Sequence, residues 1–207
     1  MVREISAHFP RYFPLVWSVP DAMGRIAITF DDGPTELTPK ILDCLASSKT
    51  QATFFVLGNE VARRPDILRQ IIAEGHEIGI HAYEHNNQHY YHQVCRCEKL
   101  LAEFGITPHV LRPPNCKIQP LETVRLWRRG YRTIIHNIDI HDSMRLENKW
   151  QGPPPNYSLI CSGDIILMHD DNLLCLQELP ELLKWIQNRQ LRAVTVSEMV
   201  EAKMRLS

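Results

Sequence analysis

Hydrophobic and polar residues along this chain follow two patterns in turn: short apolar runs, and longer stretches with helical spacing. The apolar runs predict about seven strands, at residues 25–30, 51–57, 76–80, 109–112, 131–139, 164–168 and 192–196. The stretches between them predict amphipathic helices. Strands that alternate with helices predict a parallel sheet covered by helices, either a closed or nearly closed barrel or an open doubly wound sheet.

Capping residues predict where several of the helices begin. Thr38 is the expected N-cap of the first helix, and Asn59 is the expected cap of a second helix that runs to about Glu74. Ser197 is the expected cap of the last helix. Residues 141–157 contain three prolines and a glycine and predict an irregular loop.

The composition is typical of a globular chain and excludes several classes of function. The chain has 207 residues, of which 44% are hydrophobic and 23% charged, and we expect one domain over residues 1–207. The net charge of −1 gives no electrostatic reason to expect nucleic-acid or anionic-membrane binding. No apolar run approaches the ~20 residues of a membrane span. The first residues lack the layout of a signal peptide, so we expect a cytoplasmic protein, with a secreted mature form as the alternative.

Six cysteines permit disulfides, but a chain of this length does not need a disulfide framework. We therefore expect reduced thiols, most of them buried. Cys116 is set apart from the others because it follows a candidate site motif.

The sequence Thr29-Phe30-Asp31-Asp32-Gly33-Pro34 places two adjacent carboxylates where the first predicted strand ends. Neighbouring negative charges repel each other and oppose burial, so a cation is expected to hold them. One carboxylate would bind the cation and the other would move protons. The residues themselves do not decide which is which.

The sequence His81-Ala82-Tyr83-Glu84-His85 follows the third predicted strand. If this turn is helical, the two histidines lie on one face and can bind one metal ion. Two histidines and one aspartate leave coordination positions open, which is typical of a catalytic metal. Zinc suits these ligands, and cobalt, nickel, manganese and iron are alternatives. His89 and His92 are interpreted as solvated residues.

Two further polar residues end predicted strands. Arg112 precedes Pro113-Pro114, and its guanidinium fork is suited to hold Asp31 and keep it ionised. His169 leaves a fully apolar strand and is a candidate general acid, oriented by Asp139 or Asp142. The remaining polar residues near these ends are interpreted as structural, namely Asp170, Asp171, His136 and His141.

All of these candidates lie at the carboxyl ends of their predicted strands, which is where both architectures place an active site. Polar residues scattered at random would lie at both ends. The shared placement therefore predicts one site at one edge of the sheet.

The motifs Thr-Phe-Asp-Asp-Gly-Pro, His-x3-His, Arg-Pro-Pro and Leu-Met-His-Asp occur here in that order. Over residues 24–200 the chain resembles the NodB-type polysaccharide deacetylases, the family 4 carbohydrate esterases. The resemblance implies a deformed (β/α)7 barrel with one divalent metal, often zinc. It also implies hydrolysis of N-acetyl groups on an acetylated carbohydrate such as a chitin-like oligomer or peptidoglycan, with O-acetyl esters as a further substrate class.

The resemblance also assigns roles to particular residues. It makes Asp32, His81 and His85 the metal ligands and Asp31 the catalytic base. It makes Arg112 the residue that positions Asp31.

On the other side of the site, the resemblance makes His169 the catalytic acid and Leu167 part of the wall around the acetyl methyl group. Asp142 matches the carboxylate that tunes this histidine, but the family usually has Trp after it, where this chain has Ser143 and Met144.

The loop after Arg-Pro-Pro departs from the family in the same way. The family usually has an aromatic residue and then Gly, whereas this chain has Asn115 and Cys116. The backbone N–H of Asn115 remains able to stabilise an oxyanion. Both departures lie in walls that face the substrate, so we expect hydrolysis to be retained and substrate choice to differ. Hydrolysis of a non-sugar amide and carbohydrate binding by a degenerate site are the alternatives.

Overall fold

The computed structural model describes residues 15–153 and 155–204, and within them nine strands form one sheet. The strand order is β1-β6-β5-β4-β3-β2-β8-β7, and β9 also pairs with β2. All of these pairings are parallel. The strands are β1 (Leu15–Val16), β2 (Arg25–Asp31), β3 (Thr53–Leu57), β4 (Glu77–Ala82), β5 (Val110–Leu111), β6 (Arg132–Ile134), β7 (Ile138–Asp139), β8 (Ile165–His169) and β9 (Arg192–Val194).

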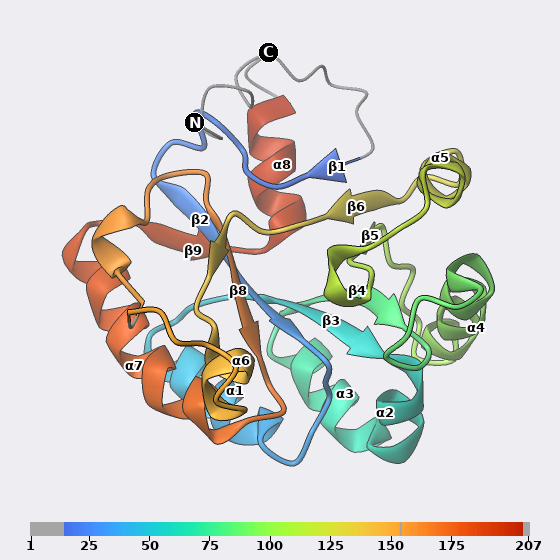
Figure 1. The fold of residues 1–207 in the computed structure, drawn as a ribbon, viewed down its shortest axis with the longest axis horizontal. Coiled ribbons are helices and arrows are strands. Elements are labelled where there is room, and N and C mark those ends of the chain that lie inside the picture. The colour runs from blue at the N-terminus through green and yellow to red at the C-terminus, as the bar shows by residue number, and fades with distance from the viewer. Residues whose placement is uncertain (1–14, 154, 205–207) are drawn as a thin grey trace.

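Helices surround the outside of the curled sheet, with α1 and α7 beside β2 and β8, and α2, α3 and α4 beside β3 and β4 (Figure 1). This arrangement confirms the predicted deformed (β/α)7 barrel. The helices are α1 (Thr38–Ser47), α2 (Gly58–Arg63), α3 (Pro65–Ala73), α4 (Tyr90–Ala102), α5 (Pro120–Trp127), α6 (Asp142–Leu146), α7 (Leu173–Asn188) and α8 (Val196–Met204). Short 3-10 turns cover Pro114–Cys116 and Tyr157–Leu159.

The central strand β2 shows why the site forms where it does. Successive side chains of a strand point to opposite faces. Ile26, Ile28 and Phe30 join the large cluster packed under the helices. The alternate residues face the barrel interior and change from Ala27, in a smaller apolar cluster, to Thr29 and then Asp31. The interior therefore becomes polar only at the carboxyl end of the strand.

The predicted strand over residues 131–139 is wrong in one important respect, because it forms two strands. β6 pairs with β1 and β5, whereas β7 pairs with β8 at the other end of the strand order. Residues 135–137 cross between them. A continuous apolar run cannot reveal that its two halves have different partners.

Several predicted helix boundaries also need correction. The helix expected from Asn59 to Glu74 is two helices, because Arg64 is not helical and Pro65 begins α3. Thr38 is the first residue of α1 rather than its N-cap, and its hydroxyl bonds Asp170 instead. Ser197 likewise lies inside α8.

Other segments differ in extent. β4 continues through His81, so this histidine lies in the strand rather than after it. The expected loop over 141–157 contains the helix α6, and β1 was not predicted.

All six cysteines lie among the described residues and are free thiols, as expected. The expectation that most of them are buried is wrong, because only Cys97 and Cys175 are buried. No helix within the described ranges is long and apolar enough to cross a membrane.

Candidate active site

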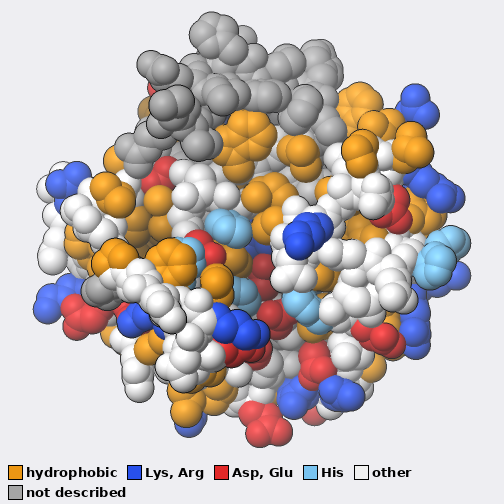
Figure 2. Space-filling view, viewed as in Figure 1, with side chains coloured by type: hydrophobic (Ala, Val, Ile, Leu, Met, Phe, Trp, Pro, Cys, Tyr) orange, Lys and Arg blue, Asp and Glu red, His pale blue; other side chains and the backbone are white. Residues whose placement is uncertain are grey.

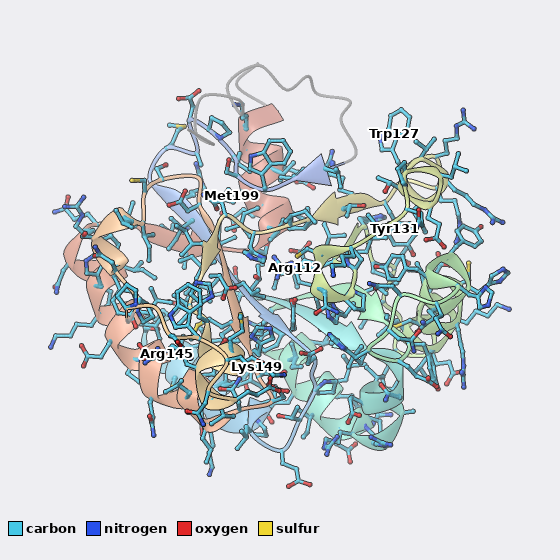
Figure 3. The ribbon with its side chains drawn as sticks, viewed as in Figure 1. Arg112, Trp127, Tyr131, Arg145, Lys149 and Met199 are labelled. Atoms are coloured by element: carbon cyan, nitrogen blue, oxygen red, sulfur yellow. The ribbon has the colours of Figure 1, made fainter. Side chains whose placement is uncertain are left out.

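The predicted site residues meet at the carboxyl ends of the strands. In the space-filling view, histidine and acidic side chains gather in the central hollow of this face (Figure 2). Arg112 lies near the middle of the sheet in the same view (Figure 3). The side chains that the sequence placed at separate strand ends are thus brought into one region.

Asp31 is held by a buried guanidinium. Arg112 Nη1 donates to Asp31 Oδ1 at 2.8 Å and to Thr29 Oγ1 at 2.7 Å. Thr29 in turn donates to the Ile166 carbonyl at 2.7 Å. Thr29 was not singled out from the sequence, although strand alternation places it on the same face as Asp31. Arg112 therefore reaches Asp31 through a network anchored on β2 and β8.

Arg112 is fully buried, so its remaining donors need partners. Nε donates to the Ile134 carbonyl at 3.3 Å and Nη2 to the Ile135 carbonyl at 3.2 Å. The guanidinium also lies 4.3 Å from the ring centroid of Phe55. These contacts fix the fork in one position and leave little freedom for Asp31.

The charges around Asp31 determine its protonation. Burial by itself raises the pKa of Asp31, but the charge and hydrogen bond of Arg112, together with the charge of His169, outweigh burial and bring the pKa below its usual value. Asp31 is therefore ionised at neutral pH even though it is almost fully buried.

Asp32, His81 and His85 form a compact group of candidate metal ligands. One ligand atom from each lies within 4.8 Å of the others, and both imidazole Nε2 atoms lie 3.5 Å from Asp32 Oδ1. Asp32 Oδ1 is buried and has no hydrogen-bond partner among the described residues. An unpartnered carboxylate oxygen between two imidazole nitrogens fits a cation.

The backbone sets the tautomer of His81. Its Nδ1 lies 2.7 Å from the carbonyl of Arg112, and a carbonyl oxygen only accepts, so Nδ1 carries the proton. The lone pair of Nε2 then faces Asp32. Burial lowers the pKa of His81 despite the nearby Asp31 and Asp32, which keeps the imidazole neutral and suited to bind metal.

The two histidines meet by a different route from the predicted one. His81 ends a strand and residues 83–86 form a bend, so the expected helical turn is wrong. The rings nevertheless lie 5.3 Å apart between centroids. Asp32 itself has a positive φ of 77°, which turns it away from the direction of β2.

His169 is paired with Asp142 and not with Asp139. Its Nδ1 lies 2.8 Å from Asp142 Oδ1, and its backbone N–H donates to Asp142 Oδ2 at 2.8 Å. Asp139 instead accepts from the backbone N–H of His141 at 2.6 Å. The helix α6, which begins at Asp142, therefore supplies the partner that the sequence left open.

This pairing controls the charge of His169. Burial alone would lower its pKa, but the hydrogen bond and charge of Asp142, with the charges of Asp31 and Asp32, raise the pKa to about 10. Nδ1 donates to Asp142, which leaves Nε2 as the second N–H of the charged ring. The imidazole is a proton donor at neutral pH.

Leu167 and Asn115 are placed as the sequence predicted, but their roles stay predictions. Leu167 pairs with Thr29 in the ladder between β8 and β2 and so shares the interior face with His169, two residues later. Asn115 is exposed in the 3-10 turn and has a φ of 53°.

Asp170 is structural, as the sequence analysis expected. It is fully buried and accepts a 2.7 Å hydrogen bond from Thr38 Oγ1. A Cβ built on Gly33 would lie 2.1 Å from Asp170 Oδ2, so only glycine fits there. Burial raises the pKa of Asp170 to about 8. A neutral carboxyl group thus packs behind the loop that carries Asp32.

Residues 19–133 match the family model described as polysaccharide deacetylase.

Individual relatives extend the similarity over more of the chain. A peptidoglycan-N-acetylglucosamine deacetylase of Bacillus cereus is 32% identical, covering 91% of this chain and 94% of the relative. The peptidoglycan-N-acetylglucosamine deacetylase PgdA of Listeria monocytogenes is 29% identical over 95% of this chain, which spans only 44% of that protein.

A solved structure is similar in fold. It is a crystal structure of a peptidoglycan N-acetylglucosamine deacetylase in complex with 4-naphthalen-1-yl-N-oxidanyl-benzamide. It superimposes with a TM-score of 0.80 at 28% identity, covering 90% of this chain and 92% of the other.

Proposed function

This chain belongs to the polysaccharide deacetylase family, and on that premise we propose that it is a metal-dependent hydrolase that removes the acetyl group from N-acetylglucosamine residues of a glycan. The names of its relatives support a peptidoglycan-type substrate, and chitin-like oligomers carry the same acetylated sugar.

One observation carries the proposal: the two adjacent carboxylates are held in different environments. Asp31 is bonded to Arg112 at 2.8 Å, whereas Asp32 lies 3.5 Å from the Nε2 atoms of His81 and His85. These separate environments support separate tasks for the two neighbours, with Asp31 as proton acceptor and Asp32 as metal ligand.

Asp32, His81 and His85 would hold one divalent metal ion. Zinc fits two imidazoles and a carboxylate, and cobalt, nickel, manganese or iron suit the same donors. When bound, the ion would polarise the acetyl carbonyl and lower the pKa of a bound water from near 16 towards ~7.

The residues beside this triad would move the protons. Asp31 is the base, because its lowered pKa keeps it ionised and ready to take a proton from the attacking water. Arg112 keeps the carboxylate in place. His169 is the acid, and its Nε2 delivers a proton to the leaving amine while Asp142 holds Nδ1.

The loop and strand walls would bind the acetyl group. The backbone N–H of Asn115 is proposed to donate to the developing oxyanion, an interaction worth about 3 kcal/mol for a well-placed donor. Leu167 is proposed to wall the methyl group.

A second candidate is hydrolysis of a non-sugar amide at the same site. It is favoured by the absence of the usual aromatic side chains, since Asn115 and Ser143 occupy positions where the family has a ring. The complete acid, base and ligand set argues against a degenerate carbohydrate-binding protein.

Acetate release tests the proposal. Peptidoglycan fragments, chitooligosaccharides, acetylxylan and a panel of small amides should be compared, each with chelator and with added zinc. We expect zinc-restored release from the N-acetylated glycans. Turnover of small amides alone would favour the second candidate, and release unaffected by chelator would contradict metal dependence.

A further inference from the structure

Cys116 and His136 form a thiol–imidazole pair beside the candidate active site. Cys116 Sγ lies 3.6 Å from His136 Nδ1, and both residues are partly buried. They come from separate segments, because Cys116 ends the turn after Arg112 and His136 lies in the crossing between β6 and β7. The proposed catalytic steps use neither residue.

The other cysteines have different surroundings. The sulfur of Cys95 accepts a hydrogen bond from Arg129, and Cys161 donates to the Leu159 carbonyl. Cys97 and Cys175 are buried in the core. The contact with an imidazole therefore gives Cys116 a chemistry that these thiols lack.

The spacing of the pair suits a shared metal ion. Zinc bonds of about 2.3 Å to sulfur and about 2.0 Å to nitrogen, at a tetrahedral angle, place the two ligand atoms about 3.5 Å apart. The observed separation is 3.6 Å. A thiol–imidazole hydrogen bond has a similar length, so a metal could replace the shared proton with little movement of either side chain.

The far side of the imidazole supports the same interpretation. Asp139 Oδ2 lies 3.9 Å from His136 Nε2. At this distance the carboxylate makes no hydrogen bond to the ring, and Asp139 Oδ2 lies nearer to His141 Nδ1, at 3.1 Å, but its negative charge favours a cation bound on the opposite side of His136.

The protonation of the pair means that a metal must displace the thiol proton in order to bind. Burial raises the pKa of the Cys116 thiol to about 11, although Arg112 opposes this. Burial and Arg112 lower the pKa of His136, so its imidazole is neutral with a free lone pair. A neutral thiol reacts slowly with alkylating agents and oxidants, but a metal that binds sulfur strongly can displace its proton.

We propose that Cys116 and His136 form a second metal site, distinct from Asp32-His81-His85, which takes a soft divalent cation such as zinc or cadmium. The metal bonds to Sγ and Nδ1, and the thiol proton leaves to solvent with no change of oxidation state. Two protein ligands bind more weakly than three, so this site fills at higher metal concentration.

A metal ion bound to Cys116 and His136 should inhibit hydrolysis at the neighbouring candidate active site. Cys116 adjoins Asn115, whose N–H is proposed to donate to the oxyanion, and the charges of Arg112 and Asp31 reach Cys116. A cation there would attract the carboxylate of Asp31 and obstruct the acetyl group. This consequence rests on the proposed function, whereas the binding itself does not.

Cadmium titration of the full-length, chelator-treated protein tests the binding. A cadmium–thiolate bond gives an ultraviolet charge-transfer band, which the Asp32-His81-His85 site cannot produce because it has no sulfur. We expect the band to grow after the sulfur-free site has filled, with equilibrium dialysis showing a second bound equivalent. Asp32→Asn should weaken the sulfur-free site and keep the band.

Matched variants identify the ligands. Cys116→Ser should remove the band and the second equivalent, and His136→Gln should weaken that equivalent by at least about tenfold. Cys161→Ser, at an exposed thiol, should change neither. If Cys116→Ser folds poorly, Cys116→Gly serves instead, because the φ of 54° at this position suits glycine. A band that survives at Cys116→Ser, or that disappears at Cys161→Ser, would overturn the site.

Measurement of acetate release separates the proposed second metal site from the proposed function. Excess zinc should inhibit acetate release by the wild type and leave Cys116→Ser largely active. A normal band with no acetate release from any glycan would count against the proposed function alone. Normal acetate release without the band would count against the metal site alone.

Discussion

The candidate site has a metal side, around Asp31 and Asp32, and an acid side, around His169. A buried anion lies on the first side and a buried cation on the second. On the metal side, Arg112 keeps the pKa of Asp31 low, so that a buried carboxylate stays charged. On the acid side, Asp142 raises the pKa of His169 to about 10, so that a mostly buried imidazole also stays charged. Each residue has a partner of opposite charge. These partners keep one group as an anionic base and the other as a cationic acid within one small region.

The two sides also differ in how the chain builds them. The metal side is carried by β2, which ends at Asp31, and by β4, which contains His81, on either side of β3, and two of its residues are consecutive in sequence. The acid side joins β8 to the helix α6, which follows the crossing from β6 to β7. The first is built mainly by strand order, and the second depends on a connection across the open side of the sheet.

Removal of a metal ligand should cause the largest loss of activity, because it acts on the metal side alone. His81→Ala removes the nitrogen that faces Asp32, so bound zinc should be lost and acetate release should fall by at least about a thousandfold. Elemental analysis after dialysis measures the zinc. The exposed His92→Ala is the control, and a zinc-loaded, active His81→Ala would refute the ligand assignment.

Removal of the base should separate chemistry from metal binding. Asp31→Asn keeps the shape but not the charge, so zinc should remain while the rate falls by about 10²–10⁴-fold. Asp43→Asn, at an exposed position, should behave as the wild type. Equal loss of zinc and activity would mean that Asp31 acts as a ligand.

The acid side should respond more mildly and with a pH signature. The acid must be protonated, so activity declines as pH rises through the pKa of His169, about 10. Asp142→Asn removes the negative charge that raises the pKa of His169. The decline in activity should then move to lower pH, and the rate should drop about 10–100-fold. The pH–rate profile of Asp139→Asn should be unchanged, and a larger shift there would reverse the assignment.

The smallest expected effect is on the free energy of unfolding, through Asp170, which packs behind the loop that carries Asp32. The pKa of Asp170 rises from 3.8 to about 8, so the folded chain holds a proton between these values that the unfolded chain releases. Stability should therefore fall as pH rises through this range, by up to about 1.4 kcal/mol per pH unit. Asp170→Asn should remove this slope in urea unfolding at several pH values. Exposed Asp171→Asn should retain it, and an unchanged slope in Asp170→Asn would contradict the assignment.

Much of the metal side could be predicted from the sequence. Adjacent carboxylates after an apolar strand and a histidine pair after another are local signals, and parallel strands bring their carboxyl ends together. The way in which His81 and His85 meet was not predictable, because a bend and a helical turn both satisfy the same spacing.

The acid side and the Cys116–His136 pair were less predictable. Asp139 and Asp142 are both near in sequence to the end of β7, and only the start of α6 brings Asp142 to His169. No local pattern marked His136. Its contact with Cys116 depends on the crossing of residues 135–137 from β6 to β7, where the apolar pattern predicts one continuous strand.

The sequence alone determined most of the alternation of strands and helices and the edge at which polar groups collect, because these follow from side-chain periodicity within single segments. Tertiary structure alone decided which strands pair at the two ends of the sheet, which carboxylate holds His169 and which imidazole meets Cys116. These contacts join residues far apart along the chain, and local periodicity carries no information about them.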